Sequence, residues 1–270
     1  MVWKRTTTGD GRLNTRKNIL ITGASAGIGA ALAQQYANAS TRLILVARNQ
    51  QRLENIAKSC EKSGSDVICI SLDITDTNVV QSTISQIDDN YPIDLIICNA
   101  GTTNSIGKNG EAETWDDICR IIDTNLYGVL ASLNPLISRM QQRQQGQIGI
   151  VSSLGAYRGM PITPSYCASK AAIKSYGEAL RGWLAEDNID VSVICPGFVE
   201  SNLSAQFHGD KPMMISTDKA ASLIIKGLNK NTANISFPFP LNLGMWFLAV
   251  LPAGIANWLM KQFSYGATRK

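Results

Sequence analysis

Short apolar segments alternate along this chain with segments whose apolar residues recur at helical spacing. Residues 18–22 (NILIT) and 42–47 (RLILVA) have the composition of buried strands. After the second of them, apolar residues follow the spacing i, i+3, i+4, i+7 from Leu53 to Cys60. Neighbouring parallel strands need a crossover connection, which is usually a helix. The alternation therefore predicts an α/β fold, a doubly wound Rossmann-like parallel sheet with helices on both faces.

The same pattern continues along the chain and predicts about seven strands. Besides the two above, we expect strands at residues 67–72, 95–98, 148–152, 191–195 and 235–237. We expect further helices at residues 28–37, 114–141, 165–184 and 218–228, the last capped by Ser216 or Thr217. A chain of 270 residues, 44% hydrophobic and 17% charged, suits one large domain, which we place at residues 18–240.

The charged and metal-ligating residue types narrow the range of partners. The net charge is +4 and no Lys/Arg-rich segment is interleaved with aromatic residues, so we expect no nucleic-acid partner. Six cysteines without a CxxC pair and a single histidine offer no set of zinc ligands, and we expect no metal. Residues 1–17 lack the apolar stretch of a secretory signal and are expected to be a disordered leader of a cytoplasmic protein.

A glycine-rich segment, TGASAGIG, joins the first expected strand to the first expected helix. Gly23, Gly27 and Gly29 allow a tight turn, the approach of a pyrophosphate and close packing of the helix on the sheet. The helix N-terminus presents unpaired N–H groups to phosphate. The spacing GxxxGxG differs from the commoner GxGxxG, so the position between strand and helix is what predicts dinucleotide binding.

Tyr166 and Lys170 form the segment YCASK within the second long helix. Residues four apart lie on one helix face, so the ammonium group can lie near the phenol. A nearby cation lowers the pKa of a tyrosine from its usual value of ~10. The pair therefore has the chemistry of a general acid/base, although Tyr/Lys pairs at this spacing are also common on protein surfaces without a function.

Taken together, the short motifs resemble one known family. TGASAGIG, CNAG at 98–101, Asn125, SS at 152–153, YxxxK at 166–170 and PG at 196–197 occur in the order typical of short-chain dehydrogenases/reductases. The resemblance extends from about residue 18 to residue 230. Two departures are mild, since Cys98 replaces the usual first Asn of NNAG and Ser201 replaces a Thr. The resemblance implies hydride transfer between a nicotinamide cofactor and a carbonyl/alcohol substrate.

The resemblance also implies a catalytic set of Ser153, Tyr166, Lys170 and Asn125. Tyr166 would give a proton to the carbonyl, or act as the base in the reverse direction. Lys170 would lower the pKa of the tyrosine and hold the nicotinamide ribose hydroxyls, and Asn125 would hold a water of the proton relay. For the serine that bonds the substrate oxygen, Ser153 fits the family register better than Ser152.

Cofactor contacts are implied on the turns that follow the strands. Asn99, Ala100 and Gly101 resemble the turn beside the adenine ribose, Asp73 the acid that accepts from the adenine amino group, and Pro196, Gly197 and Val199 the segment beside the nicotinamide carboxamide. The expected cofactor-binding residues are Gly23, Ser25, Gly27, Ile28, Gly29, Arg48, Asp73, Asn99, Ala100, Gly101, Tyr166, Lys170, Pro196, Gly197 and Val199.

The end of the second expected strand bears on the choice of cofactor. In dinucleotide-binding folds an acid about 20 positions past the glycines binds the ribose 2′-hydroxyl of NAD. Here the strand runs into VARN at residues 46–49, which holds no acid. Arg48 instead offers a planar cation suited to a 2′-phosphate. The sequence therefore predicts NADP(H), with a solvated arginine at a strand end as the alternative.

Other functions stay open for a chain with these motifs. A catalytically idle relative would bind nucleotide as a sensor or interaction protein, but it would be expected to lose the Ser, Tyr and Lys residues that are present here. A nucleotide-sugar epimerase shares the Tyr/Lys pair but needs a longer C-terminal substrate domain.

We expect a hydrophobic small-molecule substrate beneath residues 198–215, where Met213 and Met214 either line a pocket or seal the core. The two long helices lie where this family pairs subunits, so we expect a homodimer or homotetramer.

The tail, residues 241–270, departs from shorter family members. No residue from 231 to 260 is charged, and residues 241–251 are nearly all apolar. Helix breakers limit this apolar run to a length that is too short to span a bilayer. The tail then forms two short helices packed against protein, or an interfacial anchor favoured by Trp246, Trp258 and the cations Lys261, Arg269 and Lys270. We expect burial against protein, with peripheral membrane contact as the alternative.

Overall fold

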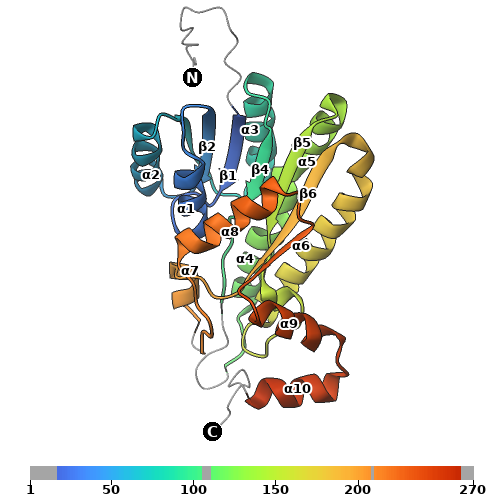
Figure 1. Cartoon of the computed structure of the whole chain (residues 1–270). Coiled ribbons are helices and arrows are strands. Elements are labelled where there is room, and N and C mark those ends of the chain that lie inside the picture. The colour runs from blue at the N-terminus through green and yellow to red at the C-terminus, as the bar shows by residue number, and fades with distance from the viewer. Residues whose placement is uncertain (1–16, 105–110, 208–209, 263–270) are drawn as a thin grey trace, which may run out of the picture.

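A seven-stranded parallel sheet forms the centre of the protein in the computed structural model, which describes residues 17–104, 111–207 and 210–262 (Figure 1). The strand order is β3-β2-β1-β4-β5-β6-β7. The strands are β1 (Lys17–Thr22), β2 (Thr41–Ala47), β3 (Asp66–Ser71), β4 (Leu95–Cys98), β5 (Gly146–Val151), β6 (Ile189–Pro196) and β7 (Asn234–Phe237). The order reverses between β1 and β4, and such a switch point is where ligands bind in doubly wound sheets. The predicted fold class is confirmed.

The described chain also forms ten α-helices and three short helical turns, of which α9 and α10 follow the last strand. The α-helices are α1 (Gly27–Tyr36), α2 (Gln50–Lys62), α3 (Thr77–Asn90), α4 (Trp115–Ile122), α5 (Gly128–Arg143), α6 (Pro164–Trp183), α7 (Asn202–Ala205), α8 (Thr217–Asn229), α9 (Leu241–Val250) and α10 (Ala253–Gln262). The turns are η1 (Asp123–Tyr127), η2 (Leu154–Ala156) and η3 (Ala185–Asp187).

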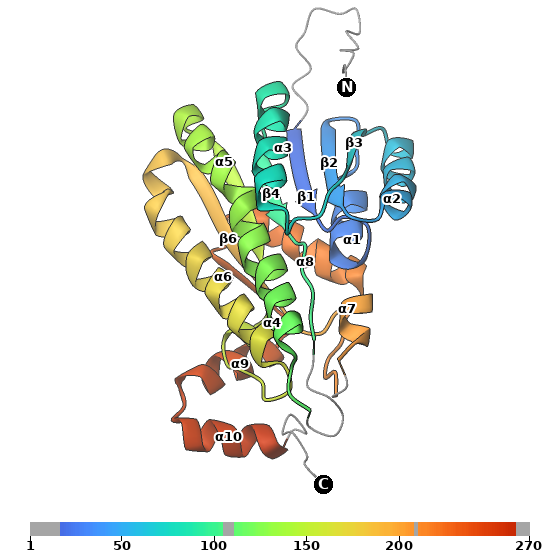
Figure 2. The ribbon, with the colours of Figure 1, turned by 180° about the vertical axis from the view of Figure 1, so that it is seen from behind.

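Helices cover both faces of the sheet (Figures 1 and 2). Successive side chains of a strand point to opposite faces. Leu95 and Ile97 of β4 accordingly pack in one cluster with α1, α2 and α8, whereas Ile96 and Cys98 pack in the other with α3, α5 and α6. Because the strands are buried on both sides, they appear in the sequence as continuous apolar runs.

Helix α3 is not among the helices that the sequence predicts. Its apolar residues Val80, Ile84 and Ile87 are buried at the spacing i, i+4, i+7, and Asp76 caps its first turn by accepting from the Val79 N–H. The segment is rich in β-branched residues, which lose χ1 freedom in a helix and weaken the helical signal. Packing against α5 stabilises the helix that local propensity leaves weak.

The long helix expected at residues 114–141 is divided by a π-helical turn. Helix α4 ends at Ile122, η1 follows, and α5 begins at Gly128, whose N–H donates to the Asp123 carbonyl five residues back. Asn125 lies inside this turn. Single π-helical turns within α-helices occur frequently at functional sites.

Only parts of the two terminal segments lie within the described residues. Of the leader, residues 1–16 lie outside the described residues, and Lys17 is the first residue of β1. The tail forms two short helices, α9 and α10; no residue of α9 is fully buried, whereas Ala256 and Met260 of α10 are. Only the inner side of α9 reaches η2 and β7, so its outer side stays exposed.

Candidate active site

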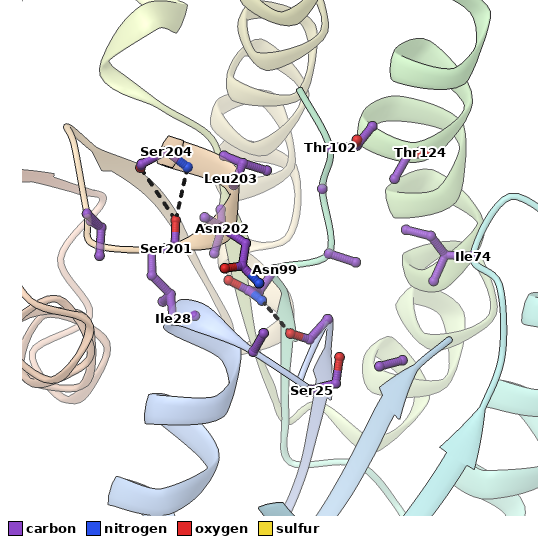
Figure 3. Close-up of a pocket in the computed structure, with 18 of the residues that line it drawn as sticks. Ser25, Ile28, Ile74, Asn99, Thr102, Thr124, Ser201, Asn202, Leu203 and Ser204 are labelled. Carbon is purple, nitrogen blue, oxygen red and sulfur yellow. Dashed lines mark hydrogen bonds between the residues drawn. The ribbon is translucent and has the colours of Figure 1, made fainter. Parts of the chain in front are cut away.

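A cleft of about 650 Å³ opens at the carboxyl ends of the strands, across the switch point between β1 and β4. This size lies within the range of small-molecule and cofactor sites. Thr102, Thr124 and Ile74 lie along one side of it, and the segment Ser201–Ser204 lies on the other (Figure 3). The cleft is thus bounded by segments far apart in the sequence, most of which follow the end of a strand.

The glycine-rich turn between β1 and α1 forms the floor of the cleft. Gly23 and Gly27 have φ values of 68° and 57°, in the left-handed region that favours glycine. A Cβ at Gly29 would lie 2.3 Å from the Gly23 carbonyl oxygen, so only glycine lets α1 approach the turn this closely. No side chain caps the N-terminus of α1, which leaves its first N–H groups available to an anion.

Asn99 braces this turn from the end of β4. Its Nδ2 donates to the carbonyl oxygens of Thr22 at 3.0 Å and Gly23 at 3.2 Å. The backbone N–H groups of Asn99 and Ala100 both donate to the Thr22 hydroxyl at 3.1 Å. These four bonds fix the loop after β4 to the glycine-rich turn, so the side chain of Asn99 acts here as a support of the cleft floor.

Tyr166 and Lys170 project from α6 toward the end of β5. Lys170 is buried, its Nζ donates to the Val151 carbonyl at 2.9 Å, and it lies 5.9 Å from the centre of the Tyr166 ring. The two adjacent serines differ: Ser152 donates its hydroxyl to the Lys170 carbonyl at 2.7 Å, whereas Ser153 bonds the phenol of Tyr166. The geometry favours Ser153 over Ser152 as the serine that faces the phenol.

The pKa values of this pair differ from what the helix spacing suggests. Burial raises the pKa of Tyr166 to about 12, although the hydrogen bond with Ser153 acts to lower it. Burial also lowers the pKa of Lys170 to about 8. The expected lowering of the tyrosine pKa by Lys170 is therefore not seen in the protein alone, because desolvation outweighs the hydrogen bond with Ser153.

Asn125 and Lys170 meet behind the loop that follows β4. Asn125 is fully buried; its Oδ1 accepts from the Thr102 N–H at 2.8 Å, and its Nδ2 donates to the Thr102 carbonyl at 2.9 Å and to Ser169 at 3.0 Å. A Cβ built at Gly101 would lie 3.2 Å from Asn125 Oδ1 and 3.3 Å from Lys170 Nζ. The amide of Asn125 thus fixes the loop after β4 to helix α6.

Two arginines line the end of the cleft beside β2 and β3. Arg48 lies 3.5 Å from Asp73 and keeps 71% of its side chain exposed, and Arg52 follows one turn into α2. Burial alone would raise the pKa of Asp73, but bonds from Thr75 and the charge of Arg48 lower it. Asp73 is therefore ionised at neutral pH and holds one guanidinium while leaving most of it free.

The segment after β6 closes the opposite end of the cleft. Gly197 donates its N–H to the Phe237 carbonyl at 2.7 Å, and Val199 bridges to Ile215. Ser201 caps α7 by accepting from the Ser204 N–H, as a threonine hydroxyl would. Further along, Met213 and Met214 are 45% and 44% exposed, so they do not seal the core.

Most of the residues expected from the sequence line this one cleft. Gly29, Asn125 and Ser153 are the three that do not line it. The cleft also includes residues that the sequence analysis missed, among them Arg52, Ile74, Thr102, Thr124, Asn202 and Leu203. The position of Arg52, four residues after Arg48, could have indicated it. Among the described residues, no group of three or more His, Cys, Asp or Glu side chains could hold a metal ion.

Comparison with known proteins bears on the family. Residues 17–212 match the family described as short chain dehydrogenase. The chain belongs to the short-chain dehydrogenase/reductase family. An uncharacterized oxidoreductase of Myxococcus xanthus is 32% identical over 237 residues, covering 87% of this chain and 93% of that protein. The resemblance drawn from the motifs is confirmed.

Two further comparisons extend this result. A ketoacyl reductase of Nostoc is 29% identical to this short-chain dehydrogenase/reductase, covering 82% of this chain and 78% of that protein. The solved structure of a short-chain dehydrogenase from Sphingobium yanoikuyae in complex with NADPH has a TM-score of 0.77 and 24% identity, covering 91% of this chain and 95% of that one. Its likeness concerns the fold.

Proposed function

We propose that this short-chain dehydrogenase/reductase uses NADP(H) and transfers a hydride to or from a hydrophobic carbonyl/alcohol substrate. The observation that carries the proposal is that Tyr166 and Lys170 of α6 line the same cleft, with the Lys170 ammonium 5.9 Å from the centre of the Tyr166 ring and Ser153 beside the phenol. A phenol and a cation that line one cleft, with a serine hydroxyl beside the phenol, are the groups that carbonyl reduction needs.

Each residue of the set would have a separate task. In reduction, the nicotinamide would supply the hydride. Tyr166 would give its phenolic proton to the substrate oxygen, and burial, which raises its pKa to about 12, keeps that proton in place at neutral pH. Ser153 would bond the same oxygen and hold it against the phenol. Lys170 would hold the ribose hydroxyls, and Asn125 would hold a water of the proton relay.

The cleft fits a dinucleotide with a 2′-phosphate. The uncapped N-terminus of α1 and the Cβ-free turn beside it suit the pyrophosphate. The guanidinium groups of Arg48 and Arg52 suit the 2′-phosphate, because arginine forms bidentate bonds with phosphate oxygens. The remaining cofactor contacts would come from Ser25, Ile28 and the ends of β3, β4 and β6, as the sequence predicts.

Replacing Arg48 should change the preference between the two nicotinamide cofactors. We expect Arg48→Ala to weaken NADPH binding about 10- to 100-fold, the loss of a charge-assisted bond of about 1.5–3 kcal/mol, and to leave NADH binding unchanged. Cofactor titration followed by protein fluorescence measures both affinities. Lys58→Ala is the matched control, since it removes an exposed cation of α2 that does not line the cleft. Equal affinities of the wild-type protein for NADPH and NADH would contradict the assignment of Arg48.

Turnover of the cofactor tests the proposed reaction itself. We expect the purified protein to oxidise NADPH in stoichiometric amounts with members of a panel of hydrophobic ketones and 3-oxoacyl compounds. A catalytically idle relative would bind NADPH in the fluorescence titration without oxidising it under any condition of the panel. An epimerase would convert its substrate without net oxidation. Either result would replace the proposal by the corresponding alternative.

Self-association is part of the same proposal. Trp115 of α4, Tyr127 of η1 and Trp183 of α6 keep 74%, 54% and 61% of their surface exposed. Large exposed aromatic residues are enriched at protein interfaces. They support a homodimer or homotetramer formed through the two long helical segments, which light scattering at micromolar concentration would detect.

A further inference from the structure

Helix α9 carries apolar side chains on all of its sides. On its inner side, Leu241 and Met245 pack against the cluster of Leu154, Val193 and Cys195. Its single polar side chain, Asn242, donates to Ser236 on β7 at 3.0 Å. The outer side presents residues at the spacing i, i+3, i+4, i+7, which are Leu243, Trp246, Phe247 and Val250. A helix that is apolar all round is normally covered on every side, either by protein or by lipid.

Neighbouring residues extend this apolar surface. In α10, Ala256 and Met260 are buried, whereas Ile255 and Trp258 are exposed. Together with Phe239 before α9, these residues form what we name the tail face: Phe239, Leu243, Trp246, Phe247, Val250, Ile255 and Trp258. Their exposed fractions run from 51% at Ile255 to 74% at Phe239. Large exposed apolar residues gathered on neighbouring segments in this way mark an interaction surface.

The charges of this part of the chain indicate what covers the tail face. No residue from 231 to 260 is charged, and no acidic residue follows Asp218. The cations Lys261, Arg269 and Lys270 follow this segment. Protein interfaces usually surround an apolar centre with a polar rim. Two tryptophans in a charge-free segment followed by cations alone instead match the interface of a membrane that carries negative headgroups.

We propose that the tail face docks on the surface of an anionic lipid bilayer, with α9 and α10 lying in the headgroup region. Each of the two helices has 10 residues. No helix in the described part of the chain is both long and apolar enough to cross a bilayer. Docking in the plane of the membrane–water interface accounts for the two short helices, for their exposed indoles and for the cations that follow residue 260.

The position of the tail face relative to the cleft links docking to the substrate. Both tail helices lie beyond the carboxyl ends of the strands, the end of the sheet where the cleft opens (Figures 1 and 2). A Cβ built at Gly197, which lines the cleft, would lie 3.3 Å from both Leu241 of α9 and Leu154. Resting on the proposed function, this arrangement indicates that the enzyme takes a lipophilic carbonyl or alcohol from the bilayer.

Vesicle flotation with the full-length protein tests the docking without any need for turnover. We expect the protein to float with vesicles of phosphatidylcholine and phosphatidylglycerol, and less with phosphatidylcholine alone. The double variant Trp246→Ser/Trp258→Ser should bind these vesicles at least about tenfold more weakly, because it removes the two largest apolar side chains of the tail face. Trp183→Ser, which removes an exposed indole from α6, should float like the wild type.

Three outcomes would overturn the docking proposal. The first is a wild-type protein that floats with neither vesicle, and the second is a double variant that floats as well as the wild type. The third is a wild-type protein that stays in solution while the double variant loses a subunit contact in light scattering, which would assign the tail face to a second copy of the chain. NADPH binding, measured on each variant by titration, shows that the variant is folded and separates these outcomes from a failure of the proposed reaction.

Discussion

Tyr166→Phe should lower the turnover of NADPH by about 10²- to 10⁴-fold, while the Kd for NADPH stays within about twofold of the wild-type value. The phenylalanine keeps the ring in its place on α6 and removes only the hydroxyl that bonds Ser153. Because the raised pKa of Tyr166 keeps that hydroxyl protonated at neutral pH, it can donate a proton at every turnover. Steady-state kinetics with the best ketone of the panel measures the loss.

A second tyrosine of the same helix supplies the control for this prediction. Tyr176 lies ten residues further along α6 and packs, partly buried, against the core cluster formed with α3 and α5. Tyr176→Phe therefore makes the same chemical change in the same helix away from the cleft, and we expect near wild-type turnover. Near wild-type turnover of Tyr166→Phe would instead refute the acid/base assignment.

The sheet and its order of elements could be predicted from the sequence because both of its faces are buried. Each strand then appears as an apolar run such as LIIC, and each break in the pattern coincides with a turn. The cleft followed from the same fact, since the carboxyl ends of parallel strands lie at one edge of the sheet and bring distant turns together. Motifs placed on those turns therefore came to lie around one cavity.

What the sequence could not supply depended on burial and on small differences in backbone hydrogen bonding. In the π-helical turn at Asn125, a backbone N–H bonds the carbonyl five residues back instead of four. This change does not alter the spacing of the apolar residues, so the sequence pattern does not reveal it. The pKa of Tyr166 follows from how deeply α6 is covered, and four-residue spacing to Lys170 does not reveal that. The exposure of α9 depends likewise on which side of the helix reaches the sheet.

Lys170→Met should abolish most of the activity and yet stabilise the protein at neutral pH. Burial lowers the pKa of Lys170 to about 8, so between that pH and its usual value the unfolded chain binds more protons than the folded one. The buried lysine therefore lowers the free energy of unfolding of the wild type most strongly below pH 8. This destabilisation disappears as the pH rises toward ~10.5. The shift in pKa corresponds to a destabilisation of about 3 kcal/mol, which the variant removes. The variant also loses the hydrogen bond to the Val151 carbonyl, which reduces this gain by about 1 kcal/mol.

The measurement is the free energy of unfolding in urea at pH 7, 8, 9 and 10, taken as the difference between Lys170→Met and the wild type. In this difference the titration of the buried cysteines, whose raised pKa values act in the opposite sense at high pH, largely cancels. We expect the variant to be more stable by about 2 kcal/mol at pH 7, and this advantage to vanish by about pH 10. Lys226→Met, at an exposed position of α8, should give a difference near zero at every pH. A difference for Lys170→Met that does not change with pH would mean that the lysine is well solvated. The buried charge would then not lower the free energy of unfolding, which would contradict this prediction.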